Sequence, residues 1–291
     1  MVSVREILRS SQATLAAAGV ASPRNDAQLI AAELLDIEPL AVPMFRLTDL
    51  PEDNQAEFLS AFASAIQRRA ERIPLQHILG KAWFGQVELA VGSGVFVPRP
   101  ETELMAEWAV SQLKRRYRGE PLVVVDMCTG SGAIAAYIAT ELFDANLPAA
   151  IHAVEISPEA AAYAKTNLER WQVEVIIGDA GDIATYPPEL IGQADLVISN
   201  PPYVPETLEL DPEVYHDPHM AVFAGTTGMT VIPRLAGVVD KLCAPGGLTA
   251  IEHDDTTQPA VIDCLAEYGF AQVVGHNDFA GRPRFVTATK L

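Results

Sequence analysis

The sequence predicts an α/β fold, with a mostly parallel sheet that follows a small N-terminal helical domain and a β-hairpin linker. Strand-like and helix-like stretches alternate after Pro98, as is typical of stacked βαβ units. Before that point, apolar residues recur at helical spacing and prolines interrupt them. The chain has 291 residues, which is enough for one large domain with a smaller one attached.

The N-terminal third predicts two structures in succession. Helical spacing extends over residues 3–38 and 51–72, so residues 1–73 are expected to form a helical domain. From residue 74 to residue 97 the apolar period shortens and glycines punctuate the chain, which predicts the β-hairpin linker.

Residues 98–291 are expected to form the α/β domain. The expected strands are 122–126, 150–155, 173–177, 196–199 and 248–252, and the expected helices are 133–142, 158–170 and about 229–242. Residues 271–274 and 285–288 are expected to close the sheet as a hairpin.

The charge of the chain argues against a nucleic-acid substrate. The formal net charge is -18, and a long phosphate backbone would be repelled unless a local basic patch overcame that field. Residues 1–97 carry 8 basic and 11 acidic side chains, a net charge of -3, which leaves 12 basic and 27 acidic side chains, or -15, for residues 98–291. The acidity is concentrated in the expected α/β domain.

Composition also indicates in which cellular compartment the protein is found. The three cysteines lack paired metal-type spacing, so neither a disulfide framework nor a zinc site is expected. The first ten residues lack an apolar signal core, and no later apolar run is long enough to cross a bilayer. A cytoplasmic protein without a membrane partner is therefore expected.

A glycine-rich loop joins the first expected strand of the α/β domain to the helix that follows it. Its sequence is Asp126-Met-Cys128-Thr129-Gly130-Ser131-Gly132. Glycines allow close backbone approach to a ligand, and the helix N-terminus offers free N–H groups to an anion. The loop also fits a dinucleotide-binding fingerprint, and it could be a purely structural tight turn.

Two acidic residues end the next expected strands. Glu155 can accept hydrogen bonds from both hydroxyls of a ribose, which would suit NAD and S-adenosylmethionine equally. Asp179, followed by Ala180, could receive an adenine amino group or could be a solvated turn residue. Because ligands of open α/β sheets bind at the carboxyl ends of strands, these residues are expected at one edge of the sheet.

The motif Asn200-Pro201-Pro202-Tyr203 directly follows the fourth expected strand of this domain. Two prolines stiffen the loop, so the Asn200 side-chain oxygen and the Pro201 carbonyl can converge on one planar NH2 group. Tyr203 can then press its ring against the flat target. This arrangement is a clamp for an amide or an exocyclic amine, although the motif could also be an ordinary proline-rich turn with a surface tyrosine.

At this point the sequence resembles the HemK/PrmC-type release factor glutamine (N5) methyltransferases. Nearly the whole chain takes part, including Pro74–Gly80 in the linker. The matching motifs are Phe96-Val-Pro-Arg99-Pro100-Glu101-Thr-Glu103, Asp126 to Gly132, Ala153-Val-Glu155-Ile-Ser-Pro-Glu, Asn200-Pro-Pro-Tyr203 and Gly281-Arg282-Pro-Arg284. Asn-Pro-Pro-Tyr alone is shared with adenine-N6 DNA methyltransferases, whereas its combination with Pro-Arg-Pro-Glu-Thr-Glu is far more specific.

The resemblance implies a Rossmann-like class I methyltransferase sheet and an enzyme that methylates the glutamine of the Gly-Gly-Gln motif in class 1 peptide chain release factors. The cofactor is implied to be S-adenosylmethionine. Its implied contacts are Cys128, Thr129, Gly130, Ser131, Gly132, Glu155, Asp179, Ala180 and Asn200. The implied catalytic residues are Asn200, Pro201, Pro202 and Tyr203.

The resemblance also places Phe96, Arg99, Pro100 and Glu101 in the wall of the substrate pocket. The residues alone give this segment a second interpretation, because a proline at a helix start with acidic residues in the first turn is ordinary N-terminal helix chemistry. Both interpretations can hold together.

Three positions depart from the family pattern. Cys128 stands where the family usually has glycine, Ala180 stands where it often has tryptophan, and His253-Asp254-Asp255 differs from a shorter Glu-x-Gly pattern. The histidines at 216, 219 and 253 lack helical ligand spacing, so they are interpreted as surface histidines and no metal site is expected.

Catalysis by such a clamp would rest on positioning, because an amide nitrogen is a poor nucleophile. The helical domain, residues 1–73, is expected to recognise the protein substrate, since one small pocket cannot select a single glutamine among many. The alternatives are an adenine-N6 or guanine-N2 nucleic-acid methyltransferase, a ribosomal-protein glutamine methyltransferase, an NAD-linked dehydrogenase and a ligand-binding scaffold. Neither of the last two explains the Asn200 clamp.

Overall fold

The computed structural model describes residues 4–206 and 209–291 and divides into two compact units. The first unit extends to Lys81 and also contains Asp211–His216, and the second comprises Ala82–Leu210 and Asp217–Leu291. Among the described residues, no helix is both long enough and apolar enough to cross a membrane.

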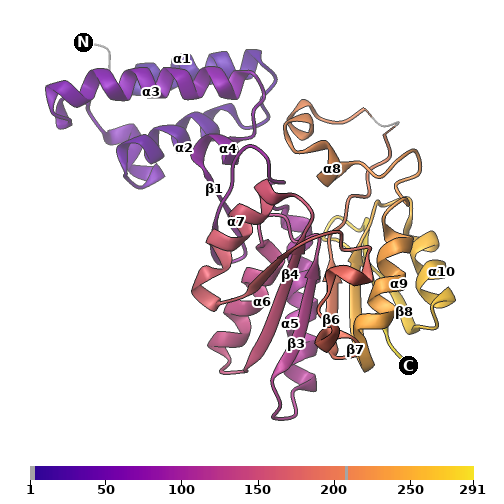
Figure 1. Cartoon of the computed structure of the whole chain (residues 1–291). Coiled ribbons are helices and arrows are strands. Elements are labelled where there is room, and N and C mark those ends of the chain that lie inside the picture. Colours follow the sequence, from indigo (N-terminus) through magenta and orange to yellow (C-terminus); the bar gives the residue numbers. More distant parts are fainter. Residues whose placement is uncertain (1–3, 207–208) are drawn as a thin grey trace. The chain divides into compact units, whose positions relative to one another are not determined.

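The first unit is helical, as expected from the spacing of its apolar residues (Figure 1). Its elements are α1 (Val4–Ala17), α2 (Pro23–Leu35), η1 (Pro39–Met44), η2 (Leu47–Asp49), α3 (Glu52–Ala70) and α4 (Leu75–Leu79). Leu15 of α1 and Ile30 of α2 are buried against Phe62 of α3 in one apolar cluster. Phe58 lies one helical turn before Phe62, and their rings stack with centroids 5.7 Å apart.

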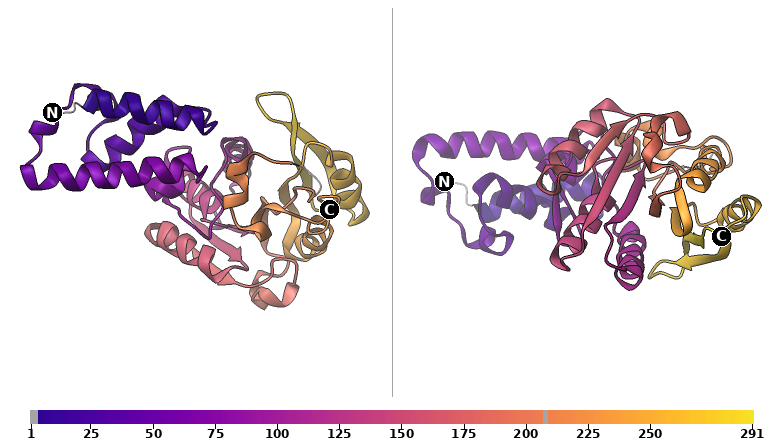
Figure 2. Two further views of the ribbon diagram at one scale, coloured as in Figure 1. Left: turned by 90° about the horizontal axis from the view of Figure 1, so that it is seen from above. Right: turned by 60° about the horizontal axis from the view of Figure 1, so that its bottom comes forward.

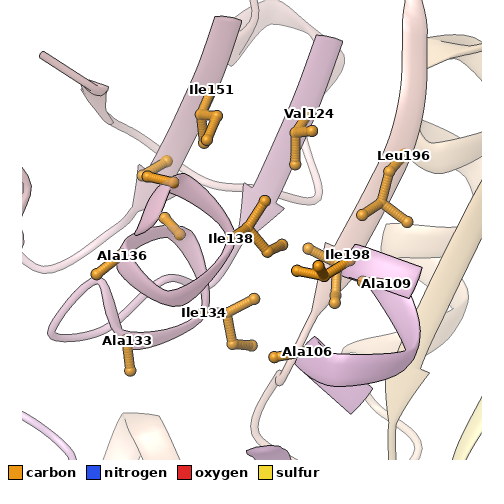
Figure 3. Close-up of a cluster of buried hydrophobic side chains, with 14 of the residues drawn as sticks. Ala106, Ala109, Val124, Ala133, Ile134, Ala136, Ile138, Ile151, Leu196 and Ile198 are labelled. Atoms are coloured by element: carbon orange, nitrogen blue, oxygen red, sulfur yellow. The ribbon is translucent and has the colours of Figure 1, made fainter. Parts of the chain in front are cut away.

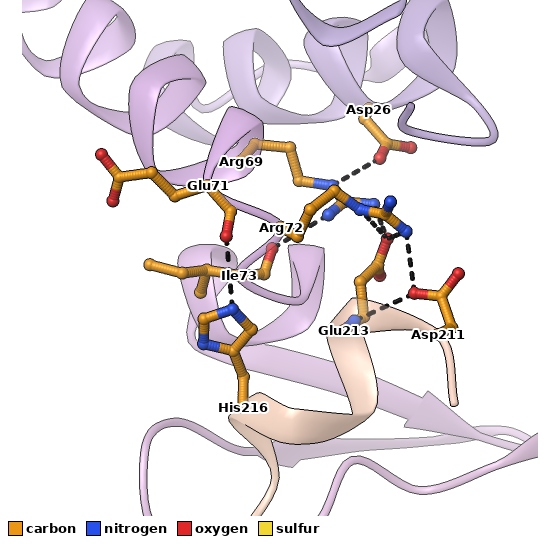
Figure 4. A network of polar contacts seen from close by, with 8 residues as sticks. All are labelled: Asp26, Arg69, Glu71, Arg72, Ile73, Asp211, Glu213 and His216. Carbon is orange, nitrogen blue, oxygen red and sulfur yellow. Dashed lines mark hydrogen bonds and ion pairs between the residues drawn. The ribbon is translucent and has the colours of Figure 1, made fainter. Parts of the chain in front are cut away.

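A buried ion pair lies at the end of this helical unit (Figure 4). Arg69 Nε donates to Asp26 Oδ2 at 2.7 Å, and both side chains are buried. Arg69 Nη2 also donates to Glu213 Oε1 at 2.7 Å, and Arg72 Nη2 donates to Asp211 Oδ1 at 2.8 Å. These contacts explain why a segment more than 130 positions further along the chain belongs to this unit.

The stretch expected as a linker, 74–97, begins with helix rather than strand. Leu75–Leu79 form α4, because Leu75 and Leu79 lie one turn apart and pack against the helical core. Gly80, with φ of 75°, ends the helix, and a two-stranded sheet of β1 (Lys81–Phe84) and β2 (Val87–Ala90) follows.

The second unit is built on a seven-stranded sheet in the order β5-β4-β3-β6-β7-β9-β8. The strands are β3 (Leu122–Met127), β4 (Ala149–Glu155), β5 (Glu174–Ile177), β6 (Ala194–Ser199), β7 (Cys243–Glu252), β8 (Ala271–Asn277) and β9 (Pro283–Thr289). Strands β3 to β7 are parallel to one another, while β9 is antiparallel to both β7 and β8. The predicted α/β fold with a closing hairpin is confirmed.

Helices cover both faces of this sheet (Figures 1 and 2). The helices of this unit are α5 (Pro100–Arg116), α6 (Ala133–Asp144), α7 (Pro158–Leu168), α8 (His219–Val222), α9 (Ile232–Leu242) and α10 (Gln258–Glu267), with the short helices η3 (Glu169–Trp171), η4 (Ile183–Thr185) and η5 (Pro188–Leu190). The short helix η6 (Pro212–His216) belongs to the first unit. Helices α5, α6 and α7 pack on one face, and α9 and α10 pack on the other.

Alternating strand residues supply the two apolar layers. Val124 of β3 packs into the cluster under α5 and α6, whereas its neighbour Val125 packs into the cluster under α9 and α10. Figure 3 shows Ile134 and Ile138 of α6 facing the strands within the first cluster. Burial on both faces explains why these strands read as nearly continuous apolar runs.

Two details of the second unit differ from the prediction. Strand β7 begins at Cys243 rather than at residue 248, because Ala194 pairs with Cys243 before a register shift brings Leu196 opposite Leu248. The turn-forming residues Pro245, Gly246 and Gly247, which separate the expected helix from the expected strand, therefore lie inside β7 at this irregularity. Helix α10 was not predicted, although Val261 and Leu265, four positions apart, bury one face of it.

Candidate active site

Two strands that are neighbours in the sheet bring the glycine-rich loop and the Asn-Pro-Pro-Tyr motif to the same edge. After β3 the chain adds β4 and β5 on one side, then crosses to β6 on the other, so strand order reverses between β3 and β6. Met127 and Ser199, the last residues of β3 and β6, are register partners, and the Ser199 hydroxyl donates to the Met127 carbonyl at 2.9 Å. Ligands of open α/β sheets bind at such a reversal point.

The backbone of the glycine-rich loop adopts conformations that favour glycine. Positive φ angles occur at Cys128 (58°), Gly130 (57°) and Gly132 (84°). The side chains of Thr129 and Ser131 are buried. The loop therefore offers its backbone, rather than these two side chains, to a ligand at the N-terminus of α6.

Cys128 departs from the family pattern at a position with a backbone reason for glycine. Its left-handed conformation costs a residue with a side chain about 1–2 kcal/mol relative to glycine. Burial, reinforced by the nearby Glu155 carboxylate, raises the pKa of its thiol to about 12. The thiol is therefore neutral and is not an activated nucleophile.

Asp126 of β3 holds the glycine-rich loop in place through hydrogen bonds. It is fully buried, and its Oδ2 accepts from the Thr129 hydroxyl at 2.6 Å and from the Ala135 N–H at 3.2 Å. Within the described chain, Oδ1 has no hydrogen-bond partner. Burial raises the pKa of Asp126 to about 7, against the lowering effect of these two hydrogen bonds.

Glu155, at the end of β4, is tied to the same loop. Its Oε2 accepts from the Gly130 N–H at 2.9 Å and its Oε1 accepts from the Ser157 N–H at 2.9 Å. Each carboxylate oxygen has a second lone pair, so these bonds leave acceptor capacity for ribose hydroxyls. The carboxylate links the ends of β3 and β4 and fixes the loop relative to the sheet.

Asp179, after β5, has an ion-pair partner that the sequence did not reveal. Arg234 of α9 donates to its Oδ2 at 2.7 Å, and the Gly181 N–H donates to its Oδ1 at 2.8 Å. The hydrogen bond from Arg234 holds the pKa of Asp179 below its usual value. Ala180 is buried under α9, and its carbonyl accepts from the Tyr186 hydroxyl at 3.0 Å.

The residues of the clamp are held by polar contacts. Asn200 Nδ2 donates to the Thr102 hydroxyl of α5 at 3.1 Å, and the Tyr203 hydroxyl donates to Glu252 Oε1 at 2.9 Å. Beyond Tyr203 the chain continues as a short ladder, in which Val204 pairs with Phe223. Pro201 is buried, so the loop between the two polar residues packs against the unit.

The segment expected in the pocket wall has a defined structure of its own. Arg99 lies over the ring of Phe96 at 4.9 Å and forms a 2.6 Å ion pair with the buried carboxylate of Asp217. Pro100 and Glu101 are exposed at the start of α5, which confirms the ordinary helix-start interpretation. A place for these residues in a pocket wall stays a prediction.

Four residues beside the predicted site were missed: Thr102, Arg234, Glu252 and Arg284. A signal existed for two of them, because Thr102 lies inside Pro-Arg-Pro-Glu-Thr-Glu and Arg284 ends Gly281-Arg282-Pro-Arg284. Nothing in the local sequence pairs Arg234 with Asp179, which is 55 positions away.

The prediction of surface histidines is wrong at one position. His216 and His219 are exposed, but His253 is fully buried, because its N–H continues the pairing of β7 with β9 by donating to the Arg284 carbonyl at 3.0 Å. Its Nδ1 lies 2.8 Å from the Asp254 carbonyl oxygen, and burial lowers its pKa. In the described part of the chain, no cluster of three or more His, Cys, Asp or Glu side chains could hold a metal ion.

Comparison with solved structures supports the fold. A methyltransferase from Pyrococcus furiosus is 21% identical, with a TM-score of 0.50 over 77% of this chain and 98% of that one. A T. thermophilus 16S rRNA N2 G1207 methyltransferase, solved with AdoMet and guanosine, is 18% identical, with a TM-score of 0.50 over 72% of this chain and 50% of that one. At these identities the likeness shows the class I methyltransferase fold alone.

Comparison with protein families covers both units. The PrmC N-terminal domain matches residues 6–80, and the methyltransferase small domain matches residues 88–217. The release factor glutamine methyltransferase of Corynebacterium glutamicum is 49% identical over the full length of both chains, and that of Mycolicibacterium smegmatis is 45% identical over 100% of this chain and 99% of its own. The chain therefore belongs to the family of release factor glutamine methyltransferases.

Proposed function

We propose that this protein transfers a methyl group from S-adenosylmethionine to the side-chain amide nitrogen of the glutamine in the Gly-Gly-Gln motif of class 1 peptide chain release factors. The observation that carries the proposal is the position of Asn200. It follows β6 at the reversal point of the sheet, one strand away from the glycine-rich loop after β3. A cofactor on that loop and an amide at Asn200 would therefore meet at one edge of the sheet.

The residues at this edge fit S-adenosylmethionine. A Cβ added at Gly130 would meet no atom within 4 Å, so the backbone there is open to close approach. The Glu155 carboxylate suits ribose hydroxyls, and Asp179 suits an adenine amino group. We assign Cys128 to Gly132, Glu155, Asp179, Ala180 and Asn200 to this binding role.

The chemistry follows from what the clamp residues present. S-adenosylmethionine supplies an electrophilic methyl group. Asn200 Oδ1 and the Pro201 carbonyl would accept from the two N–H groups of the target amide, which holds its nitrogen in line for attack. Their oxygens also stabilise the positive charge that develops on that nitrogen. A bond from the amide nitrogen to the methyl carbon would form as the bond from that carbon to the sulfonium sulfur breaks, which leaves S-adenosylhomocysteine as a neutral thioether. The methylated nitrogen would then lose a proton to water, so no general base is required.

The helical unit is proposed to recognise the release factor. Two large apolar side chains of η1, Leu40 and Met44, are 85% and 76% exposed, unlike the rest of the apolar face that forms the core. Exposed apolar side chains on a small domain suit contact with a protein partner. We further propose a cytoplasmic location, because release factors act in translation there.

Transfer of labelled methyl groups tests this function against its rivals. The protein is incubated with labelled S-adenosylmethionine and, separately, with a release factor, ribosomes or DNA. We expect label in the release factor and none after its Gly-Gly-Gln glutamine is replaced by leucine. Label in DNA or in a ribosomal protein, with none in the release factor, would refute the proposal.

A further inference from the structure

Arg234 of α9 and the loop after β5 hold the Asp179 side chain by both of its carboxylate oxygens. Arg234 Nη2 donates to Oδ2 at 2.7 Å, and the Gly181 N–H donates to Oδ1 at 2.8 Å. The Asp179 carbonyl also accepts from the Thr185 hydroxyl at 2.8 Å and from the Asp182 N–H at 3.0 Å. Hydrogen bonds therefore fix both the backbone and the side chain of Asp179.

The Arg234 side chain packs directly on this loop. A Cβ atom added at Gly181 would lie 3.2 Å from both Cβ and Cζ of Arg234 and 3.3 Å from its Nη2, which is tighter than ordinary van der Waals contact. Gly181 does not have a positive φ angle, so its small size matters here rather than its backbone freedom. The guanidinium group can lie against the loop because residue 181 has no side chain.

Stability of the fold does not account for this ion pair. The side chains of Arg234 and Asp179 are 55% and 37% exposed, and ion pairs between exposed side chains contribute little to stability because water screens them. Each carboxylate oxygen of Asp179 has a second lone pair, so it can accept from a further donor. The hydrogen bond from Arg234 also holds the pKa of Asp179 below its usual value, so this acceptor stays ionised.

We propose that Arg234 is a positioning residue of the cofactor site, which holds the Asp179 carboxylate in the orientation that accepts from the 6-amino group of adenine. The inference rests on the proposed function, because it takes Asp179 as the acceptor for the adenine of S-adenosylmethionine. Arg234 does not touch the ligand in this account. It limits the rotation of the carboxylate, so the acceptor is in place before the cofactor binds.

Arg234→Met tests the role of the guanidinium group. Methionine keeps an unbranched side chain but carries no charge and cannot donate a hydrogen bond. We expect it to weaken the binding of S-adenosylhomocysteine about tenfold, the effect of losing one hydrogen bond to a charged group, with an unchanged Tm. Lys241→Met is the matched control, because it removes a positive charge from an exposed position of the same helix. Equal affinities of Arg234→Met and the wild type would overturn the proposal.

A second ligand separates loss of orientation from general damage to the site. The analogue of S-adenosylhomocysteine in which hydrogen replaces the 6-amino group has nothing to donate to Asp179. The wild type should therefore bind S-adenosylhomocysteine about tenfold more tightly than this analogue, whereas Arg234→Met should bind the two with nearly equal affinity. General damage would weaken both ligands equally and leave their ratio unchanged. That result, or the absence of a preference in the wild type, would overturn the proposal.

Asp179→Ala shows whether Arg234 acts through Asp179. In this background Arg234→Met should cause no further loss of affinity for S-adenosylhomocysteine, because the carboxylate that Arg234 positions is gone. Additive losses would show that Arg234 acts on the ligand by another route and would overturn the proposal. All of these are binding measurements, so a wild type that binds S-adenosylhomocysteine but transfers no methyl group to release factors would refute only the proposed function.

Discussion

Gly228 lies so close to the backbone carbonyl oxygen of Tyr203 that a Cβ atom on Gly228 would overlap it. The φ angle of Gly228 is 73°, so its backbone also favours glycine. The backbone of the Asn-Pro-Pro-Tyr loop therefore packs directly against the backbone of Gly228, which leaves no room for a side chain at that position.

Gly228→Ala should displace the loop and slow methyl transfer, because a shift of about 1 Å at a reacting group can cost about 10²-fold in rate. The variant is assayed by single-turnover methyl transfer. The matched control is Gly192→Ala, which has a similar φ of 70° but no atom within 4 Å of the added Cβ. Equal rates in the two variants would show that close packing at Tyr203 does not matter.

The cysteines should resist alkylation in the folded protein. Burial raises the pKa of Cys128 to about 12 and that of Cys243 to about 12, and it also raises the pKa of Cys264. Because the thiolate is the reactive form, iodoacetamide at about pH 8 should label all three slowly. Protein unfolded in urea provides the control and should react fully. Rapid labelling of Cys128, which is half-buried, would contradict the neutral state of its thiol in the folded protein.

Much of the second unit was predictable because its strands are buried on both faces. Apolar runs such as residues 122–125 mark the strands, and the turn residues at Gly130 and Gly132 mark the loop that follows. The order of these elements was enough to place the loop and Asn200 at the same edge of the sheet.

Contacts between distant segments were not predictable in the same way. Glu252 lies 49 positions from Tyr203, and Arg69 lies 144 positions from Glu213. Local periodicity carries no information about such pairs, since it reports only which face of an element is buried. His253 was misplaced for a related reason: its burial depends on pairing with β9, which begins 30 positions later.

Stability should fall as pH rises through the range in which Asp126 titrates. Its pKa in the folded protein is about 7, above the ordinary 3.8. Between these values the folded protein keeps a proton that the unfolded chain has lost, so the free energy of unfolding decreases from about pH 4 to about pH 7 and then levels off. Each unit of pKa difference corresponds to about 1.4 kcal/mol.

Asp126→Asn removes this titration, so its stability relative to the wild type should increase from about pH 5 to about pH 8. Urea unfolding at both pH values measures the difference. Asp263→Asn, at an exposed position on α10, serves as the control and should follow the wild type. A constant difference between Asp126→Asn and the wild type across this range would show that Asp126 does not hold its proton in the folded state.

Recognition by the helical unit predicts an effect that depends on the substrate. Leu40→Asp combined with Met44→Asp should lower kcat/KM for an intact release factor about tenfold, which is the effect expected from losing a modest interface contact. The same variant should leave kcat/KM for a short Gly-Gly-Gln peptide unchanged. Phe279→Asp is the matched control, because Phe279 is 92% exposed on the second unit. Equal losses on protein and peptide would argue that η1 serves only the fold.

The rate of methyl transfer by Asn200→Ala tests the central claim most directly. The variant is compared with the wild type in a single-turnover reaction on a release factor at saturating S-adenosylmethionine, because Asn200 is also assigned to the cofactor site. Circular dichroism checks its fold, and cofactor titration gives the concentration that saturates it. Loss of one preorganised acceptor should lower the rate about 10²–10³-fold. Near-wild-type transfer to the same glutamine would contradict the assignment of Asn200 as the residue that holds the target amide.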